Sequence, residues 1–216
     1  GVRALFTGPS GTGKTLVAGW LATKLGLPLY RVDLASIIST NMEKMEKKLS
    51  SLLAKAEQAE IVLLFDDADL LFGKHAEIEG SKKGYVNAQK NYLLQRIEFY
   101  QGIMLLTSHS RHWFDSAFTQ RLDKIIEFPL PEQNERRSLW LTHLGVNHQL
   151  DLTQLNQLAV LSDLAGGHIR NVVLAAAVIA QAEHRLIQFD DIIAGLVGEY
   201  RNLGRQIPVE LIRNQA

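Results

Sequence analysis

The sequence contains no cysteine, which excludes disulfide bonds, thiolate zinc sites and cysteine nucleophiles. This composition fits a reducing compartment, and we expect a cytoplasmic protein. The chain also has no excess charge of either sign, because 23 Lys and Arg residues balance 23 Asp and Glu residues. Without a net positive charge, the sequence does not predict a general nucleic-acid binder held by phosphate contacts.

Long apolar runs are missing as well. The longest, Val172–Ala180, has nine residues, whereas a membrane-spanning helix needs about 20. No secretory signal is visible, so we expect a soluble protein without a membrane segment. Hydrophobic residues make up 46% of the 216 residues, enough for a buried core. Because the chain opens directly inside the largely apolar segment Val2–Phe6, we expect it to be a piece of a longer protein.

Short apolar runs alternate with helical patterns over the first 130 residues. Such runs predict buried strands at Ala4–Phe6, Leu29–Val32, Ile61–Phe65, Ile103–Leu106 and Ile125–Phe128. Between these runs, helical spacing predicts three helices, each with one apolar face. The three faces consist of Val17, Leu21 and Leu25; of Met45, Leu49, Leu52, Leu53 and Ala56; and of Leu93, Leu94, Ile97 and Tyr100. Strands that alternate with helices predict an α/β fold with a mainly parallel sheet of about five strands, flanked by helices.

The periodicity changes after the segment Phe128-Pro129-Leu130-Pro131, beyond which only helical spacing is visible. Residues 169–180 carry apolar side chains at i, i+3, i+4, i+7, i+8 and i+11. Asp190 is in a position to cap a last helix. We therefore predict an α/β domain over residues 1–130 and a small all-helical domain over residues 131–216.

The most specific motif is a glycine-rich loop that follows the first predicted strand and precedes a helix. It consists of Gly8, Pro9, Ser10, Gly11, Thr12, Gly13, Lys14 and Thr15 and fits the pattern G-x-x-x-x-G-K-[ST]. The glycines let successive backbone N–H groups point at an anion, and the following helix adds its positive end. Lys14 is placed to reach the β- and γ-phosphates of a nucleotide, and Thr15 to hold Mg²⁺.

Two carboxylates follow the third predicted strand. A parallel strand buried on both faces should exclude charge, so Asp66 and Asp67 lie at the sheet edge where ligands bind. We expect Asp66 to bind Mg²⁺ opposite Thr15, and Asp67 to orient or deprotonate an attacking water. The alternative is that the pair caps the next segment, because Asp is a common cap.

With these motifs the sequence resembles the AAA+ ATPases over nearly its whole length. GPSGTGKT resembles their Walker A motif, and IVLLFDDADLLFGK resembles their Walker B motif and its continuation. The stretch Tyr85–Glu98 is similar to a bacterial subgroup, some of whose members are encoded with contractile injection systems. The resemblance implies a helical lid, ATP as the nucleotide, and homo-oligomeric rings, such as hexamers, with ATP at the subunit interfaces.

The resemblance also implies roles for residues outside the two motifs. His109 matches the position of sensor 1, Arg121 lies in the arginine-finger segment, and Arg170 matches the arginine of sensor 2. An arginine finger would stabilise transition-state charge on the γ-phosphate of a neighbouring subunit. The alternatives remain that Arg121 is simply an exposed arginine and that Arg170 is a solvated residue at a helix start.

The sequence departs from the family pattern at residues that serve hydrolysis and mechanical coupling. Asp67 replaces the usual catalytic glutamate, His109 replaces the usual asparagine, and Gln120 replaces a second arginine. The pore-loop position reads Asn41-Met42-Glu43 instead of aromatic–aliphatic–glycine. We therefore expect firm ATP–Mg²⁺ binding with slow turnover. Two functions stay open: an ATPase that remodels a protein complex, and a nucleotide-dependent assembly factor that hardly turns over.

Overall fold

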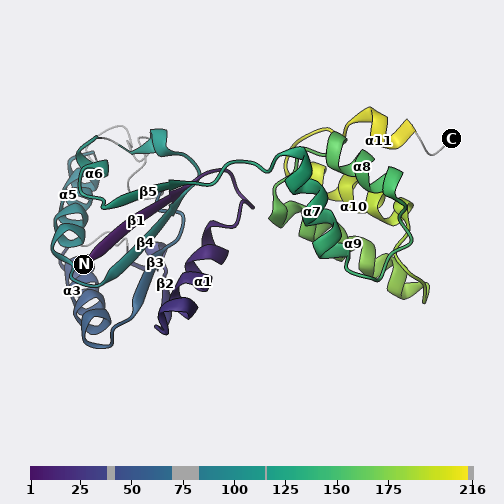
Figure 1. Cartoon of the computed structure of the whole chain (residues 1–216). Helices are drawn as coiled ribbons and strands as arrows, with labels where there is room; N and C mark the ends of the chain where they lie inside the picture. Colours follow the sequence, from purple (N-terminus) through teal and green to yellow (C-terminus); the bar gives the residue numbers. More distant parts are fainter. Residues whose placement is uncertain (38–41, 70–82, 115, 214–216) are drawn as a thin grey trace. The chain divides into compact units, whose positions relative to one another are not determined.

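The computed structural model describes residues 1–37, 42–69, 83–114 and 116–213 (Figure 1). It divides into two compact units. Residues 1–9 and 14–128 form the first unit, and residues 10–13 and 129–216 form the second. No helix within the described ranges combines the length and the apolar character that crossing a bilayer requires.

The first unit contains a five-stranded parallel sheet with the strand order β2-β3-β4-β1-β5 (Figure 1). The strands are β1 (Val2–Thr7), β2 (Leu29–Val32), β3 (Val62–Phe65), β4 (Ile103–Ser108) and β5 (Lys124–Glu127). All five predicted strands are therefore confirmed, and so is the α/β fold class. Because the strands are parallel, their carboxyl ends lie along one edge of the sheet, where the residues of both sequence motifs follow them.

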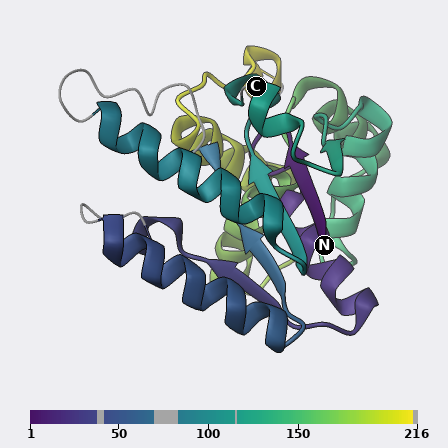
Figure 2. The ribbon, with the colours of Figure 1, turned by 90° about the vertical axis from the view of Figure 1, so that its left-hand side faces the viewer.

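Both faces of the sheet are covered by helices. Leu63 and Phe65 of β3 pack in one cluster with α3 (Met42–Gln58) and α5 (Lys83–Phe99). The alternate residues Val62 and Leu64 pack in another cluster with α1 (Lys14–Leu25). Figure 2 shows α3 and α5 side by side over their face of the sheet. Successive strand side chains thus point to opposite faces, which explains why these strands read as continuous apolar runs.

The buried faces of α3 and α5 agree with the faces expected from the sequence, whereas the buried face of α1 differs from the expected one. The predicted faces of α3 and α5 are buried or partly buried as expected. On α1, however, the buried apolar residues are Ala18 and Ala22, while Leu25 is 48% exposed. The small alanines let α1 lie close to the sheet, so the expected face of Val17, Leu21 and Leu25 is only partly correct. The described residues of this unit also include the short helices α2 (Leu34–Ile37), η2 (Arg111–Trp113) and α6 (Ser116–Thr119).

Apart from an isolated β-bridge, the regular elements in the described part of the second unit are helices. They are α7 (Gln133–Leu144), α8 (Leu152–Leu161), α9 (Gly166–Ala182), α10 (Phe189–Asn202) and α11 (Val209–Arg213). Trp140 and Tyr200 are its largest fully buried side chains, and each satisfies its polar atom. Trp140 Nε1 donates to Ser162 Oγ at 3.3 Å, and Tyr200 Oη donates to Asp163 Oδ1 at 2.9 Å.

The expectation about Asp190 is wrong. Gln188 is the N-cap of α10, so Asp190 lies inside the first turn, and α10 is followed by α11. Asp191, one residue further, accepts a hydrogen bond from Gln188 N at 2.8 Å. Asp191 also forms a two-point ion pair with Arg185, from Nη1 at 2.5 Å and from Nη2 at 2.9 Å. Asp191 thus ties the start of α10 to the preceding loop.

Replacing Asp191 with alanine is expected to lower the free energy of unfolding by about 2 kcal/mol. The substitution removes a buried carboxylate together with the charge-assisted hydrogen bonds that it accepts. Hydrogen bonds from Arg185 hold the pKa of Asp191 below its ordinary value of 3.8. This stabilisation is therefore complete above that value and is lost as the pH falls through the lowered pKa. Urea denaturation at pH 7 and near pH 3, followed by circular dichroism, should show a gap between wild type and variant that shrinks in acid.

The matched control is Glu183→Ala. Glu183 also pairs with Arg185, at 2.6 Å, but its side chain is 60% exposed. Exposed ion pairs contribute little, so this variant should unfold close to the wild type. Equal losses for the two variants would contradict the role given to the buried carboxylate.

Candidate functional site

The glycine-rich loop joins the end of β1 to the start of α1. Gly8 adopts φ of 146°, and a Cβ atom there would lie 2.1 Å from the carbonyl oxygen of Phe128. Gly13 has φ of 97°, also in the region that disfavours side chains. Gly8 N donates to Ser108 O at 3.1 Å, which fixes the loop start beside β4. The first unit thus holds both ends of the loop, while Ser10, Gly11, Thr12 and Gly13 group with the second unit.

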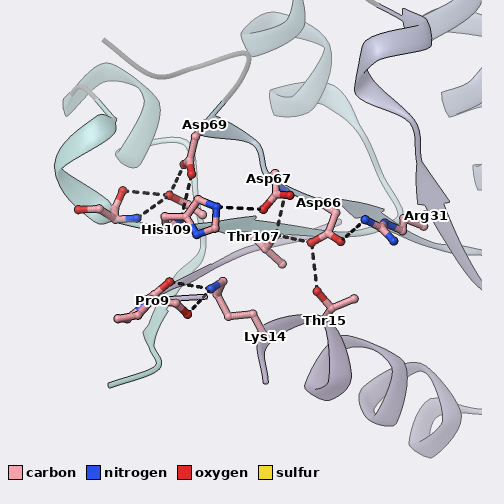
Figure 3. A network of polar contacts seen from close by, with 12 residues as sticks. Pro9, Lys14, Thr15, Arg31, Asp66, Asp67, Asp69, Thr107 and His109 are labelled. Carbon is pink, nitrogen blue, oxygen red and sulfur yellow. Dashed lines mark hydrogen bonds and ion pairs between the residues drawn. The ribbon is translucent and has the colours of Figure 1, made fainter. Parts of the chain in front are cut away.

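Lys14 is the first residue of α1, and its side chain is buried. Its Nζ donates to the carbonyl oxygens of Gly8 at 2.6 Å and Pro9 at 2.8 Å (Figure 3). Burial lowers the pKa of Lys14, and the carboxylates of Asp67, Asp69 and Asp66 partly offset this effect. The ammonium group therefore lies between the loop and a set of acids. The negative charge of a phosphate chain would balance the ammonium group, and the cation bound to the phosphates would balance the acids.

Asp66 follows β3 and is brought together with Thr15, as predicted. Thr15 Oγ1 donates to Asp66 Oδ1 at 3.1 Å. Thr107 Oγ1, from β4, donates to the same oxygen at 2.5 Å. Arg31 Nη2, from β2, lies 2.9 Å from the other oxygen, Oδ2. Figure 3 shows these groups converging on Asp66 from three different elements.

The donor set at Thr15 and Asp66 fits Mg²⁺. One hydroxyl and one carboxylate are hard oxygen ligands, and Mg²⁺ is commonly held by one or two carboxylates together with substrate phosphates. No cluster of three or more His, Cys, Asp or Glu residues that could hold a metal ion occurs in the described part of the chain. The two residues are thus suited to a cation that arrives with phosphate oxygens.

Asp67 has an unusual backbone conformation. Its φ of 53° is in the left-handed region, which Asp tolerates better than most residues. Its backbone N donates to Thr107 Oγ1 at 3.0 Å, and its carboxylate is half-exposed. His109 Nε2 lies 3.6 Å from Asp67 Oδ1, which is too long for a direct hydrogen bond. The strand end therefore directs the Asp67 carboxylate toward His109 and solvent, while Asp66 faces Thr15.

Asp69 was not selected from the sequence, although it is the most buried of the three acids near Lys14, at 7% exposure. Its Oδ1 accepts a short hydrogen bond from Ser108 Oγ, and its Oδ2 accepts from His109 N at 2.9 Å. The carboxylate thus fixes the backbone that carries His109. Thr107 and Arg31 were missed as well. The signals that could have indicated Arg31 and Asp69 were a charged residue inside the apolar run Leu29–Val32 and a third acid two residues after Asp67.

Arg121 follows α6 and is held within its own chain. Its Nε donates to Glu98 Oε2 at 3.0 Å, and its Nη1 donates a short hydrogen bond to Ala117 O. The side chain is about one-third exposed, so part of the guanidinium surface faces solvent.

Arg170 is exposed in the first turns of α9, in the second unit, where its charge contributes to lowering the pKa of His143 after the larger effect of burial. Of the expected pore-loop residues, Asn41 lies outside the described residues, and Met42 is the first residue of α3.

Comparisons with known proteins show what this chain is similar to. The family model described as "ATPase family associated with various cellular activities (AAA)" matches residues 4–130. The katanin p60 ATPase-containing subunit A1 of Strongylocentrotus purpuratus is 30% identical over 189 residues, which cover 82% of this chain and 36% of that protein. Protein SUPPRESSOR OF K(+) TRANSPORT GROWTH DEFECT 1 of Arabidopsis thaliana is 31% identical over 150 residues, covering 65% and 33%.

A solved structure extends the likeness to the fold. The crystal structure of the FIGL-1 AAA domain in complex with ADP superposes with a TM-score of 0.70 at 20% identity, covering 89% of this chain and 70% of that chain. The chain spans about a third of the length of the two curated relatives above. Since the family model matches more than half of the chain, the protein belongs to the AAA family of ATPases.

Proposed function

We propose that the protein binds ATP with Mg²⁺ and hydrolyses it slowly at interfaces between identical subunits, in order to remodel or assemble a protein complex. The observation that carries this proposal is the 3.1 Å contact between Thr15 and Asp66, beside a loop that begins with Gly8. In the proposal, residues 1–130 are the nucleotide-binding core and residues 131–216 are the lid.

The residues of the phosphate loop and of the strand ends then have distinct roles. The backbone of Gly8–Gly13 and the Lys14 ammonium would bind the phosphates. Thr15 and Asp66 would hold Mg²⁺, which neutralises charge on the β- and γ-phosphates. Asp67 would accept a proton from the water that attacks the γ-phosphorus, as the bond to the β–γ bridging oxygen breaks. His109 would donate a hydrogen bond to the γ-phosphate or to this water.

Two arginines complete the proposed site. Arg121 would reach the γ-phosphate of a neighbouring subunit, and Arg170 would contact phosphate in its own subunit. The ion pair of Arg121 with Glu98 supports the first role, because it holds the guanidinium in one orientation at the end of α6. Fixed donors aimed at developing charge need no reorganisation during the reaction.

The proposed turnover is slow because Asp67 is one methylene shorter than glutamate, the usual residue at this position in the family. A misplacement of about 1 Å can cost roughly 100-fold in rate. The same observation favours a second candidate, a nucleotide-binding assembly factor with little or no turnover. In either case we propose a homo-oligomeric ring, such as a hexamer, in the cytoplasm. The stretch Tyr85–Glu98 resembles a bacterial subgroup, some of whose members are encoded with contractile injection systems, and on this ground we propose a protein assembly as the substrate.

Steady-state ATP hydrolysis across a range of protein concentrations tests the proposal. Activity per subunit should rise with concentration, because Arg121 acts on a neighbour. Mixing two inactive variants gives a sharper test. Arg121→Ala keeps an intact phosphate loop, and Lys14→Ala keeps an intact Arg121, so mixed rings should regain part of the activity. Arg111→Ala, which removes an exposed arginine from η2, is the control and should stay active by itself.

The outcomes separate the two candidates. Nucleotide binding with no hydrolysis at any concentration would favour the assembly factor. Hydrolysis that is independent of concentration, with full activity of Arg121→Ala alone, would overturn catalysis at subunit interfaces.

A further inference from the structure

Arg31 is a charged residue in an otherwise apolar strand. In the parallel pairing of β2 with β3, Arg31 is opposite Leu64, and the next residue, Val32, is opposite Phe65. The side chain therefore starts beside the end of β3, directly before Asp66. It is 67% exposed, but its Nη2 approaches to 2.9 Å from Asp66 Oδ2, and the Asp66 side chain is only 11% exposed.

The two oxygens of Asp66 have separate partners. Oδ1 accepts from the hydroxyls of Thr15 and Thr107, whereas Oδ2 is paired with Arg31 (Figure 3). With both oxygens held, the carboxylate has one orientation, and Oδ1 is the oxygen that faces the phosphate loop. Thr15 donates its proton to Asp66, so the lone pairs of its hydroxyl remain for another partner.

We propose that Arg31 is a positioning residue for the metal site, which holds Asp66 by Oδ2 so that Oδ1 and Thr15 present their oxygens together to a divalent cation bound with nucleotide. The inference rests on the proposed function, because it assumes that nucleotide binds with Mg²⁺. Groups that orient a metal ligand commonly affect metal affinity by 10- to 100-fold. An ion pair with so exposed a partner contributes little to folding, so its effect on the metal can be measured without loss of the fold.

The test is a Mg²⁺ titration of the binding of a fluorescent ATP analogue, with wild type, Arg31→Gln and Arg31→Lys. Arg31→Gln should raise the Mg²⁺ concentration for half-maximal binding about tenfold, while affinity in EDTA stays unchanged. Arg31→Lys keeps the charge and should recover part of the loss. Arg111→Gln removes an exposed arginine from another part of the first unit and should titrate like the wild type. A merely structural role for Arg31 would change binding with and without Mg²⁺ alike.

Three results would overturn the inference. The first is a Mg²⁺ midpoint of Arg31→Gln equal to that of the wild type. The second is a lower midpoint, which would make Arg31 a competitor of the cation, and the third is an equal loss of nucleotide affinity in Mg²⁺ and in EDTA. Failure of the proposed function has a different signature: a folded wild type that binds no nucleotide, or binds it equally with and without Mg²⁺, removes the basis of both proposals.

Discussion

Replacing Lys14 with alanine is expected to abolish ATP binding, with a loss of at least about 100-fold in affinity. In the structure Lys14 Nζ donates to Gly8 O and Pro9 O, so the ammonium group lies inside the glycine-rich loop. Two charge-assisted hydrogen bonds to phosphate oxygens contribute together about 3 kcal/mol, which corresponds to about 100-fold. Titration of a fluorescent ATP analogue in the presence of Mg²⁺ measures the loss directly.

The control for Lys14→Ala is Lys24→Ala, in the last turn of the same helix, where the lysine lies 5.8 Å from the ring centroid of Trp20. Lys24→Ala should bind nucleotide like the wild type. Thermal unfolding without nucleotide should show Lys14→Ala folded, because burial disfavours the charged form of this lysine and its removal relieves that cost. A folded Lys14→Ala protein with wild-type affinity would show that the loop is not a phosphate site.

Replacing Asp67 with asparagine is expected to reduce ATP turnover by about 100-fold while leaving nucleotide affinity unchanged. Asparagine removes the base, and general-base groups contribute about 10²- to 10⁴-fold. It also tolerates the left-handed conformation of this position, at φ of 53°, so the strand end should keep its path. Steady-state phosphate release, together with the analogue titration, separates loss of chemistry from loss of binding.

Asp67→Glu is the companion variant. The longer side chain should bring the carboxylate nearer to the attacking water and raise turnover by up to about 100-fold. A glutamate is less comfortable than aspartate with positive φ, so part of this gain is offset by backbone strain. Equal rates for wild type and Asp67→Glu, in a regime where chemistry limits turnover, would argue against the short carboxylate as the cause of slow hydrolysis.

Much of the fold could be predicted because the strands of a parallel sheet are apolar throughout. All five strands were located within a few residues, since runs such as Ile61–Phe65 are bounded by polar or helical sequence. The orientation of α1 was less predictable. Its apolar residues are spaced around most of the helix, and close packing selected Ala18 and Ala22 in place of Leu25. Asp190 was misassigned because α10 begins one residue before it, with Gln188 as the N-cap.

The site residues that belong to a continuous motif in the sequence could be predicted. Local motifs identified the loop and Asp66, and the order of motifs along parallel strands implied the contact with Thr15. Partners supplied through space were not predictable in the same way. Arg31 and Thr107 come from β2 and β4, which lie on either side of β3. They are neighbours of Asp66 because of this strand order, which the spacing of residues along the sequence does not predict.

The buried carboxylate of Asp69 ties the ends of β3 and β4 into a single stiff element, because it is bonded to Ser108 and to the backbone of His109. Beyond His109 the chain passes through Phe114 and Phe118, whose stacked rings lie 4.6 Å apart in the core, and then reaches Arg121. The backbone that carries His109 is therefore held from both strands, and a shift of either strand end would move His109 with it.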